Sequence, residues 1–175
     1  MKNEVINALC ERRSVRGYKN EQISDEQLAE ILKAGTYAPS GRGRQSSIII
    51  AVQNKETIKA LSEKNAEIMG TPDRDPFYGA PTVLVVLADK SIPTHFEDGC
   101  LVMGNLMNAA YAVGVDSCWI HRARETFDSD FGRALLDAWG VSGDYVGIGH
   151  VSLGYRSSDY PVAAERKQDY VRFVK

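Results

Sequence analysis

Long hydrophobic runs are missing from this sequence of 175 residues. The longest strongly apolar run is Val83 to Ala88, far shorter than the ~20 residues that a membrane-spanning helix needs. The first ten residues mix charged and polar side chains with spaced apolar ones, so they lack the unbroken apolar segment of a secretory signal. We therefore expect no membrane partner and a cytoplasmic location.

The sequence also has few cysteines and no large excess of charge of either sign. The three cysteines are odd in number and form no CxxC pair, which is typical of reduced thiols in a reducing compartment. The three histidines show no metal-ligand spacing with each other or with the cysteines, so no metal is expected. The formal net charge is -2, so binding to nucleic acid would depend on a local basic patch.

The composition is 43% hydrophobic and 25% charged, which is typical of a globular protein, and the length favours a single domain over residues 1–175. Hydrophobic periodicity predicts alternating elements. The expected helices cover residues 5–10, 24–35, 55–69, 97–113 and 131–139. The expected strands cover residues 47–52, 82–88, 115–120 and 145–155. Residues 38–44 and 70–81 are rich in Gly and Pro and are expected to be loops.

Short motifs mark several of these boundaries. Ser24 with Gln27, and Thr94 with Glu97, have the spacing of capping boxes at helix starts. Gly35 is a candidate helix end. The Ile run within 47–52 predicts a buried strand, and residues 170–174 alternate like an exposed strand or one borrowed by a partner.

Basic residues form two clusters that are far apart in the sequence. Arg12, Arg13, Ser14 and Arg16 follow the first helix, and this combination suits a phosphate, because Arg offers a planar fork of donors and Ser adds a hydroxyl. Cations at a helix C-terminus also complement the helix dipole, so the motif alone leaves both interpretations open. Arg166-Lys167 is the second cluster, for which a solvated tail is the alternative.

The loop from Ala38 to Gln45 combines flexible glycines with an amide that both donates and accepts hydrogen bonds. These features suit the edge of a heterocycle, although an ordinary turn has the same composition. Neither Gly41-Arg42-Gly43 nor Gly147-Ile148-Gly149 completes the dinucleotide-binding fingerprint, because the third glycine is absent. A Rossmann fold is therefore disfavoured.

In sequence order, the combination of these motifs resembles the nitroreductase family over nearly the whole chain. The matching segments are Arg12 to Tyr18, Ala38-Pro39-Ser40 with Gln45, Asn105, Gly114 with Ser117 to Ile120, Gly154-Tyr155 and Arg166-Lys167. The resemblance implies an α+β fold with a central, mainly antiparallel mixed sheet flanked by helices. It also implies FMN as cofactor and a homodimer in which the C-terminal strand extends to the partner subunit.

The resemblance also implies roles for individual residues. The FMN phosphate and ribityl chain would be held by Arg12, Ser14, Arg166 and Lys167, with Arg13 alongside. Arg16 would lie near the N1 and C2 carbonyl edge of the flavin, where a cation stabilises negative charge. The ring would be lined from the other subunit by Pro39, Ser40, Gly41 and Gln45. The inner wall would come from Trp119, Ile120 and His121, with a backbone N–H directed at N5.

The chain departs from the family pattern in the loop, at Gly43 and Ser46, and after Trp-Ile, where His121 and Arg122 add bulk and charge. The function implied is an FMN-dependent oxidoreductase that uses NAD(P)H to reduce nitroaromatic or quinone-like acceptors by a ping-pong mechanism. The flavin supplies the redox chemistry, so no catalytic side chain is nominated. The alternatives are a non-catalytic flavin-binding sensor or carrier and, disfavoured by the acidic balance, a nucleic-acid module.

Overall fold

The computed structural model describes residues 3–175 and contains one four-stranded sheet. Its strands are β1 (Ser47–Val52), β2 (Thr82–Asp89), β3 (Asp116–Ile120) and β4 (Tyr145–Gly154), in the order β1-β2-β4-β3. All three strand pairings are antiparallel. The only parallel pairing in the described part of the chain is an isolated bridge between Ser14 and Ser117, so the sheet is mainly antiparallel as predicted.

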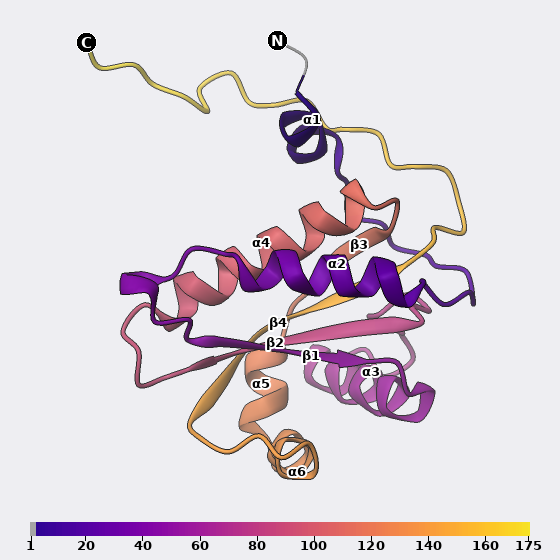
Figure 1. Cartoon of the computed structure of the whole chain (residues 1–175). Coiled ribbons are helices and arrows are strands. Elements are labelled where there is room, and N and C mark those ends of the chain that lie inside the picture. The colour runs from indigo at the N-terminus through magenta and orange to yellow at the C-terminus, as the bar shows by residue number, and fades with distance from the viewer. Residues whose placement is uncertain (1–2) are drawn as a thin grey trace.

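Helices cover both faces of the sheet, as Figure 1 shows. One face carries α2 (Asp25–Thr36) and α4 (His95–Ala112), and the other carries α3 (Lys55–Met69), α5 (Ala123–Asp128) and α6 (Asp130–Ala138). The short helix α1 (Glu4–Glu11) lies outside these layers, next to the end of α4. The predicted α+β fold, with helices flanking a central sheet, is confirmed.

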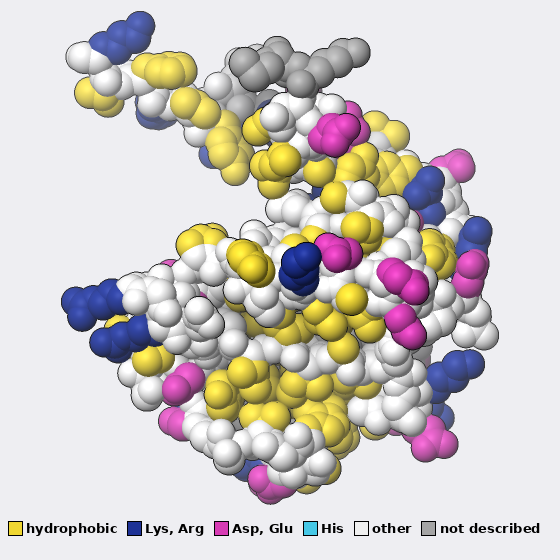
Figure 2. Space-filling model, viewed as in Figure 1, with side chains coloured by type: hydrophobic (Ala, Val, Ile, Leu, Met, Phe, Trp, Pro, Cys, Tyr) yellow, Lys and Arg dark blue, Asp and Glu magenta, His cyan; other side chains and the backbone are white. Residues whose placement is uncertain are grey.

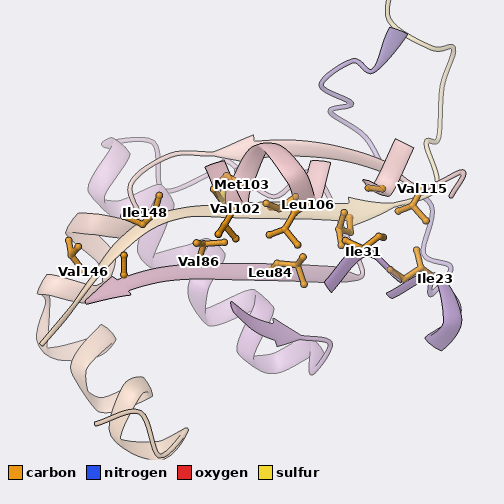
Figure 3. Packing of buried hydrophobic residues seen from close by; sticks show 14 residues of the cluster. Ile23, Ile31, Leu84, Val86, Val102, Met103, Leu106, Val115, Val146 and Ile148 are labelled. Atoms are coloured by element: carbon orange, nitrogen blue, oxygen red, sulfur yellow. The ribbon is translucent and has the colours of Figure 1, made fainter. Parts of the chain in front are cut away.

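Strand β2 explains why the core has two halves. Its side chains alternate between the faces, and all of them from Thr82 to Ala88 are buried. Leu84 and Val86 pack with Ile31 of α2 and Leu106 of α4 (Figure 3), whereas the alternate valines pack against α3 and α5. A central strand buried on both faces is expected to have the continuous apolar run seen in its sequence.

Glycine permits one close approach between layers. A Cβ atom added at Gly147 of β4 would overlap the backbone of Ala123, at the start of α5. Helix α5 therefore lies directly on the strand. This contact fixes the position of His121 and Arg122, which join β3 to α5.

Several sequence predictions are confirmed closely. Strand β1 and helix α3 have the predicted bounds. The capping box at the start of α2 is present, with the Gln27 N–H donating to Ser24 Oγ at 3.2 Å and the Ser24 N–H donating to Gln27 Oε1 at 3.1 Å. These bonds satisfy N–H groups that the first turn of a helix leaves without partners.

Other predictions are wrong. Helix α4 begins at His95 rather than at residue 97, and Thr94 makes no capping bond, because its hydroxyl donates to the Asp98 carboxylate instead. Gly35 does not end its helix. It is buried in the last turn of α2, where a Cβ would contact Leu106 and Ile49, so its role is close packing.

Helix α5, six residues long, was not predicted. Strand β1 is an edge strand of this chain and is half-buried over most of its length rather than buried. Residues 161–175 form an exposed C-terminal arm that holds no strand (Figures 1 and 2). Pairing of residues 170–174 with a partner subunit therefore stays a prediction.

Candidate functional site

The first basic cluster runs alongside the free edge of β3. The N–H of Val15 donates to the Ser117 carbonyl at 3.1 Å, and Ser14 and Ser117 form the isolated parallel bridge. The buried side chains of Val15 and Tyr18 anchor this segment, and the Tyr18 hydroxyl donates to the Val15 carbonyl at 2.9 Å. The segment therefore holds Arg12, Ser14 and Arg16 at the end of the sheet in a defined conformation.

Arg12 is the most informative member of this cluster. Its side chain is half-buried, and its Nη1 atom is shielded from solvent without a hydrogen-bond partner in the described part of the chain. By contrast, Arg13 Nη1 donates to the carbonyls of Cys10 and Arg12, both at 2.7 Å. A buried donor on a charged group is costly when it is unpaired. The residues therefore fit an anionic ligand at Arg12, such as the phosphate of a mononucleotide.

Cys118 lies behind this cluster and is buried. Burial raises the pKa of its thiol, although the charges of Arg16 and Arg12 and a hydrogen bond with Ser14 oppose the increase. A raised pKa leaves little thiolate at neutral pH. Cys118 therefore packs as a small core residue, and Arg12, Ser14 and Arg16 all lie near enough to affect its thiol.

The loop before β1 is held by a carboxylate that sequence reasoning did not select. Asp98 of α4 is buried, with 3% of its surface exposed. It accepts hydrogen bonds from the Gly41 N–H (2.9 Å), the Ser46 hydroxyl (2.8 Å) and the Thr94 hydroxyl (3.1 Å). Burial acts to raise the pKa of Asp98, but these three bonds together outweigh burial and hold the pKa below its ordinary value. Asp98 is therefore an ionised anchor for the loop.

The loop between Gly41 and Ser46, the two residues bound to Asp98, is strained. Arg42 and Gln45 both have positive φ, at 56° and 51°, a conformation that costs a residue with a side chain roughly 1–3 kcal/mol. The Gln45 N–H donates to Ser40 Oγ at 3.0 Å. Pro39, Ser40 and Gln45 line one end of a cavity of about 400 Å³ between α2 and β1. The loop predicted to line a heterocycle therefore has a defined conformation that specific hydrogen bonds hold, unlike an ordinary turn.

The predicted inner wall is divided between the two faces of β3. Trp119 is half-buried against Gly149 and the α4 side of the sheet, whereas Ile120 is buried in the opposite core. Only His121 has an exposed side chain. The Ser117 carbonyl faces the free edge of β3, where Val15 binds it. Because peptide groups repeat direction every second residue, the N–H of Trp119 points to the same edge.

Two buried polar residues lie next to the end of β3 and the segment that follows it. Asn65 of α3 is fully buried, and its Nδ2 donates to the His121 carbonyl at 2.8 Å. His150 of β4 is also fully buried, with its ring 5.2 Å from that of Phe77. Burial lowers the pKa of His150 to about 4, against the opposing effect of the Ile120 and His121 backbone. No sequence signal distinguished these two residues from ordinary polar positions.

The second basic cluster lies in the C-terminal arm, apart from the first. Arg166 donates to the Ala164 carbonyl at 3.1 and 2.7 Å, and Lys167 lies over the ring of Tyr170 at 5.4 Å. Within residues 3–175, no hydrogen bond or ion pair joins this pair to Arg12. The arm does start beside the first cluster, because the Tyr160 hydroxyl accepts a hydrogen bond from the Arg13 N–H at 2.7 Å.

No group of three or more His, Cys, Asp or Glu side chains within residues 3–175 is arranged to hold a metal ion. In the same residues, no helix combines the length and apolar character that a membrane span requires.

Known proteins share both the sequence pattern and the fold. The Nitroreductase family profile matches residues 9–155. A candidate NADH dehydrogenase/NAD(P)H nitroreductase of Archaeoglobus fulgidus is 30% identical over 159 residues, which cover 87% of this chain and 85% of that protein. A nitroreductase with bound FMN from Bacteroides fragilis is 29% identical and superposes with a TM-score of 0.91, covering 99% of this chain and 100% of the other.

A second solved structure agrees with the first. The nitroreductase with bound FMN from Desulfitobacterium hafniense is 28% identical, with a TM-score of 0.88 and complete coverage of both chains. The family profile covers most of the chain, and the neighbours match it from end to end. The chain therefore belongs to the nitroreductase family.

Proposed function

We propose that this protein is an FMN-dependent oxidoreductase that uses NADH or NADPH to reduce nitroaromatic or quinone-like acceptors by a ping-pong mechanism. Family membership supports this function, as do the FMN-bound neighbours from Bacteroides fragilis and Desulfitobacterium hafniense. A relative from Bacillus subtilis, 40% identical over 87 residues covering 50% of this chain and 32% of its own, is named as an NAD(P)H FMN reductase.

The observation that carries the proposal is the buried, unpartnered Nη1 of Arg12 beside Ser14. A guanidinium without a protein partner has donors free for a phosphate, which it binds with paired, charge-assisted hydrogen bonds. Arg13 uses its own guanidinium on backbone carbonyls, so it supports the segment alongside the phosphate. Arg16 is exposed and free to face the polar edge of a flavin ring.

The remaining binding residues come from two segments, the C-terminal arm and the loop before β1. Arg166 and Lys167 would complete the phosphate and ribityl site, and Tyr160 fixes the arm six residues before Arg166. Six extended residues span at most roughly 20 Å, which is enough to return to the first cluster or to reach a partner's. Ser40, Gly41 and Gln45, with Pro39, would line the ring of the partner's flavin.

The residues around the ring would bind and orient the flavin and the substrates. Bound FMN would supply the redox chemistry between the nicotinamide and the acceptor. Trp119 and Ile120 would form the inner wall through the edge of β3, with a backbone N–H directed toward N5. His121 would stand at the mouth, where its exposed side chain and that of Arg122 border the substrates.

We also propose a homodimer. Helices α1 and α4 expose large apolar side chains, namely Val5, Ile6, Leu9, Phe96 and Leu101. The arm carries further exposed apolar residues, including Val162, Phe173 and Val174, and stands clear of the body in Figure 2. Exposed apolar surface on this scale is typical of a subunit interface. The dimer would bring the loop of one subunit to the flavin ring of the other.

The test is to purify the protein, saturate it with FMN, remove free flavin and add NADH or NADPH without oxygen. We expect a yellow protein whose flavin absorbance bleaches with the nicotinamide and returns on adding a quinone or nitroaromatic. Stable flavin binding without bleaching would instead identify a sensor or carrier. A protein that takes up no FMN would contradict the proposed function.

A further inference from the structure

Asp98 occupies an unusual place for a carboxylate, because it is buried beneath the strained loop and accepts hydrogen bonds from both ends of that loop, besides one from Thr94 at the start of its own helix. The Gly41 N–H lies at one end of the loop and the Ser46 hydroxyl at the other, and Asp98 accepts from both. A single side chain thus closes the loop across its base. Hydrogen bonds to an ionised acceptor are stronger than bonds between neutral groups.

The conformation that Asp98 closes is one that the loop would not adopt by itself. Arg42 and Gln45 lie in the left-handed region, with Gly43 between them at a φ of 65°. Backbone in this region persists only where surrounding contacts hold it. The other hydrogen bonds of residues 40–45 are internal to the loop. The Gln45 N–H donates to Ser40 Oγ, and the N–H groups of residues 43 and 44 donate to the carbonyls of residues 40 and 41. The bonds to Asp98 therefore connect this conformation to the rigid start of α4.

We infer that Asp98 is a positioning residue for flavin binding, because it holds Ser40 to Gln45 in the shape that lines the flavin ring across the dimer. This inference rests on the proposed function. Asp98 does not touch the cofactor and acts through the loop. Without it, the loop would have to become ordered when FMN binds, and that ordering cost would appear as weaker binding.

The chain offers a matched control. Asp75 likewise accepts three hydrogen bonds, in its case from one hydroxyl and two backbone N–H groups, namely Ser62 Oγ (2.6 Å), Phe77 N (2.9 Å) and Gly79 N (2.6 Å). It closes a different loop, within residues 70–81. Asp75→Asn therefore tests whether loosening any carboxylate-anchored loop gives the same result as loosening the one before β1.

The first measurement reports the loop without any cofactor. Arg42 and Arg44 are exposed, so trypsin cleavage after them follows the mobility of the loop, and cleavage after Arg74 is an internal reference. Asp98→Ala should speed cleavage at Arg42 and Arg44 about tenfold in the apo protein and leave the Arg74 site unchanged. Asp98→Asn, which keeps one acceptor oxygen, should show a smaller increase. Asp75→Asn should leave cleavage at Arg42 and Arg44 unchanged.

The second measurement is the dissociation constant of FMN, from quenching of flavin fluorescence, with the absorbance spectrum of the bound flavin. Asp98→Ala should raise the constant about tenfold, as expected for the loss of one charge-assisted bond. Asp98→Asn should recover part of the affinity. The spectrum should shift in the order wild type, Asp98→Asn, Asp98→Ala, because the loop lines the ring.

If Asp98→Ala does not fold, as judged by circular dichroism, Gly41→Ala and Asp98→Asn decide the result. A Cβ at Gly41 would clash with Thr94 Oγ1 and push the loop away while leaving Asp98 in place. Faster cleavage with unchanged FMN affinity and spectrum would overturn the inference and leave the proposed function intact. A wild-type protein that binds no FMN would overturn the proposed function, and the role in flavin binding with it.

Discussion

Arg12 is the residue on which the cofactor site depends most. Its buried Nη1 has no hydrogen-bond partner among residues 3–175, so the charge destabilises the apo protein and is compensated when an anion binds. Arg12→Gln should therefore raise the FMN dissociation constant at least about tenfold. The melting temperature of the apo protein should stay the same or rise. Fluorescence titration and thermal unfolding check the two effects separately.

Arg133→Gln is the control, because Arg133 is an exposed arginine paired with Asp130 on α6. It should change neither quantity. If Arg12→Gln destabilised the apo protein and left FMN affinity unchanged, Arg12 would be a structural residue and the phosphate site would lie elsewhere.

His150 predicts a pH dependence of stability. Its pKa is about 4 in the folded protein against an ordinary value of 6.5. Between these pH values the unfolded chain binds a proton that the folded protein does not, so stability falls as the pH is lowered from above 6.5 toward 4. The loss amounts to about 3 kcal/mol. Urea unfolding at a series of pH values measures it.

Replacing the imidazole isolates its contribution. His150→Leu should flatten the pH dependence between 4 and 6.5, whereas His121→Leu, at an exposed position, should preserve it. An unchanged slope in His150→Leu would show that the buried imidazole is not its cause.

At the scale of elements, β4 and α5 make a contact that admits no side chain at Gly147. Gly147→Ala should destabilise the protein by roughly 1–3 kcal/mol, because the Ala123 backbone has to move. Gly149→Ala, two residues along the same strand, should cost less, because its Cβ would meet side chains and no backbone, namely the flexible end of Met103 at 2.6 Å and the edge of the Trp119 indole at 3.0 Å. Chemical denaturation compares the two variants. Equal losses would contradict the account of why α5 lies where it does.

Local patterns predicted most elements, and their failures have physical causes. The run from Val83 to Ala88 reads correctly as a central strand because both faces of β2 are buried. The Thr94 prediction failed because its hydroxyl donates to the carboxylate of Asp98, four residues further along the same helix, instead of capping the first turn. Asp98 is itself held by Gly41 and Ser46 of a loop distant in sequence, which no local pattern reveals. Helix α5 is too short to show a hydrophobic period.

The candidate site likewise contains residues that the sequence points to and residues that it does not. Arg12 and Ser14 were predicted by chemistry that lies within five residues of sequence, together with the family resemblance. Asp98, Asn65 and His150 were not, because their importance comes from burial, which the fold creates. In the sequence, a buried polar residue of a helix or strand cannot be distinguished from an exposed one.

At the scale of the whole molecule, the C-terminal arm is expected to join subunits and complete the cofactor site. Removing residues 161–175 should leave the body folded, because the last anchoring contacts of the arm are those of Tyr160. The truncated protein should elute as a monomer on gel filtration and bind FMN weakly. That the whole chain from 1 to 175 acts as one domain stays a prediction.

A full-length variant separates the two roles of the arm. Arg166→Gln with Lys167→Gln should remain a dimer and still lose FMN affinity. If the double variant bound FMN as well as the wild type, the second basic cluster would have no part in the site.

The central claim is that basic side chains from the two clusters hold a single flavin phosphate. The most direct test compares the binding of FMN and riboflavin, which differ only in that phosphate. The wild-type protein should bind FMN at least about a hundredfold more tightly, and the preference should shrink in both Arg12→Gln and the Arg166→Gln, Lys167→Gln variant. Equal affinity of the wild type for the two flavins would contradict the account.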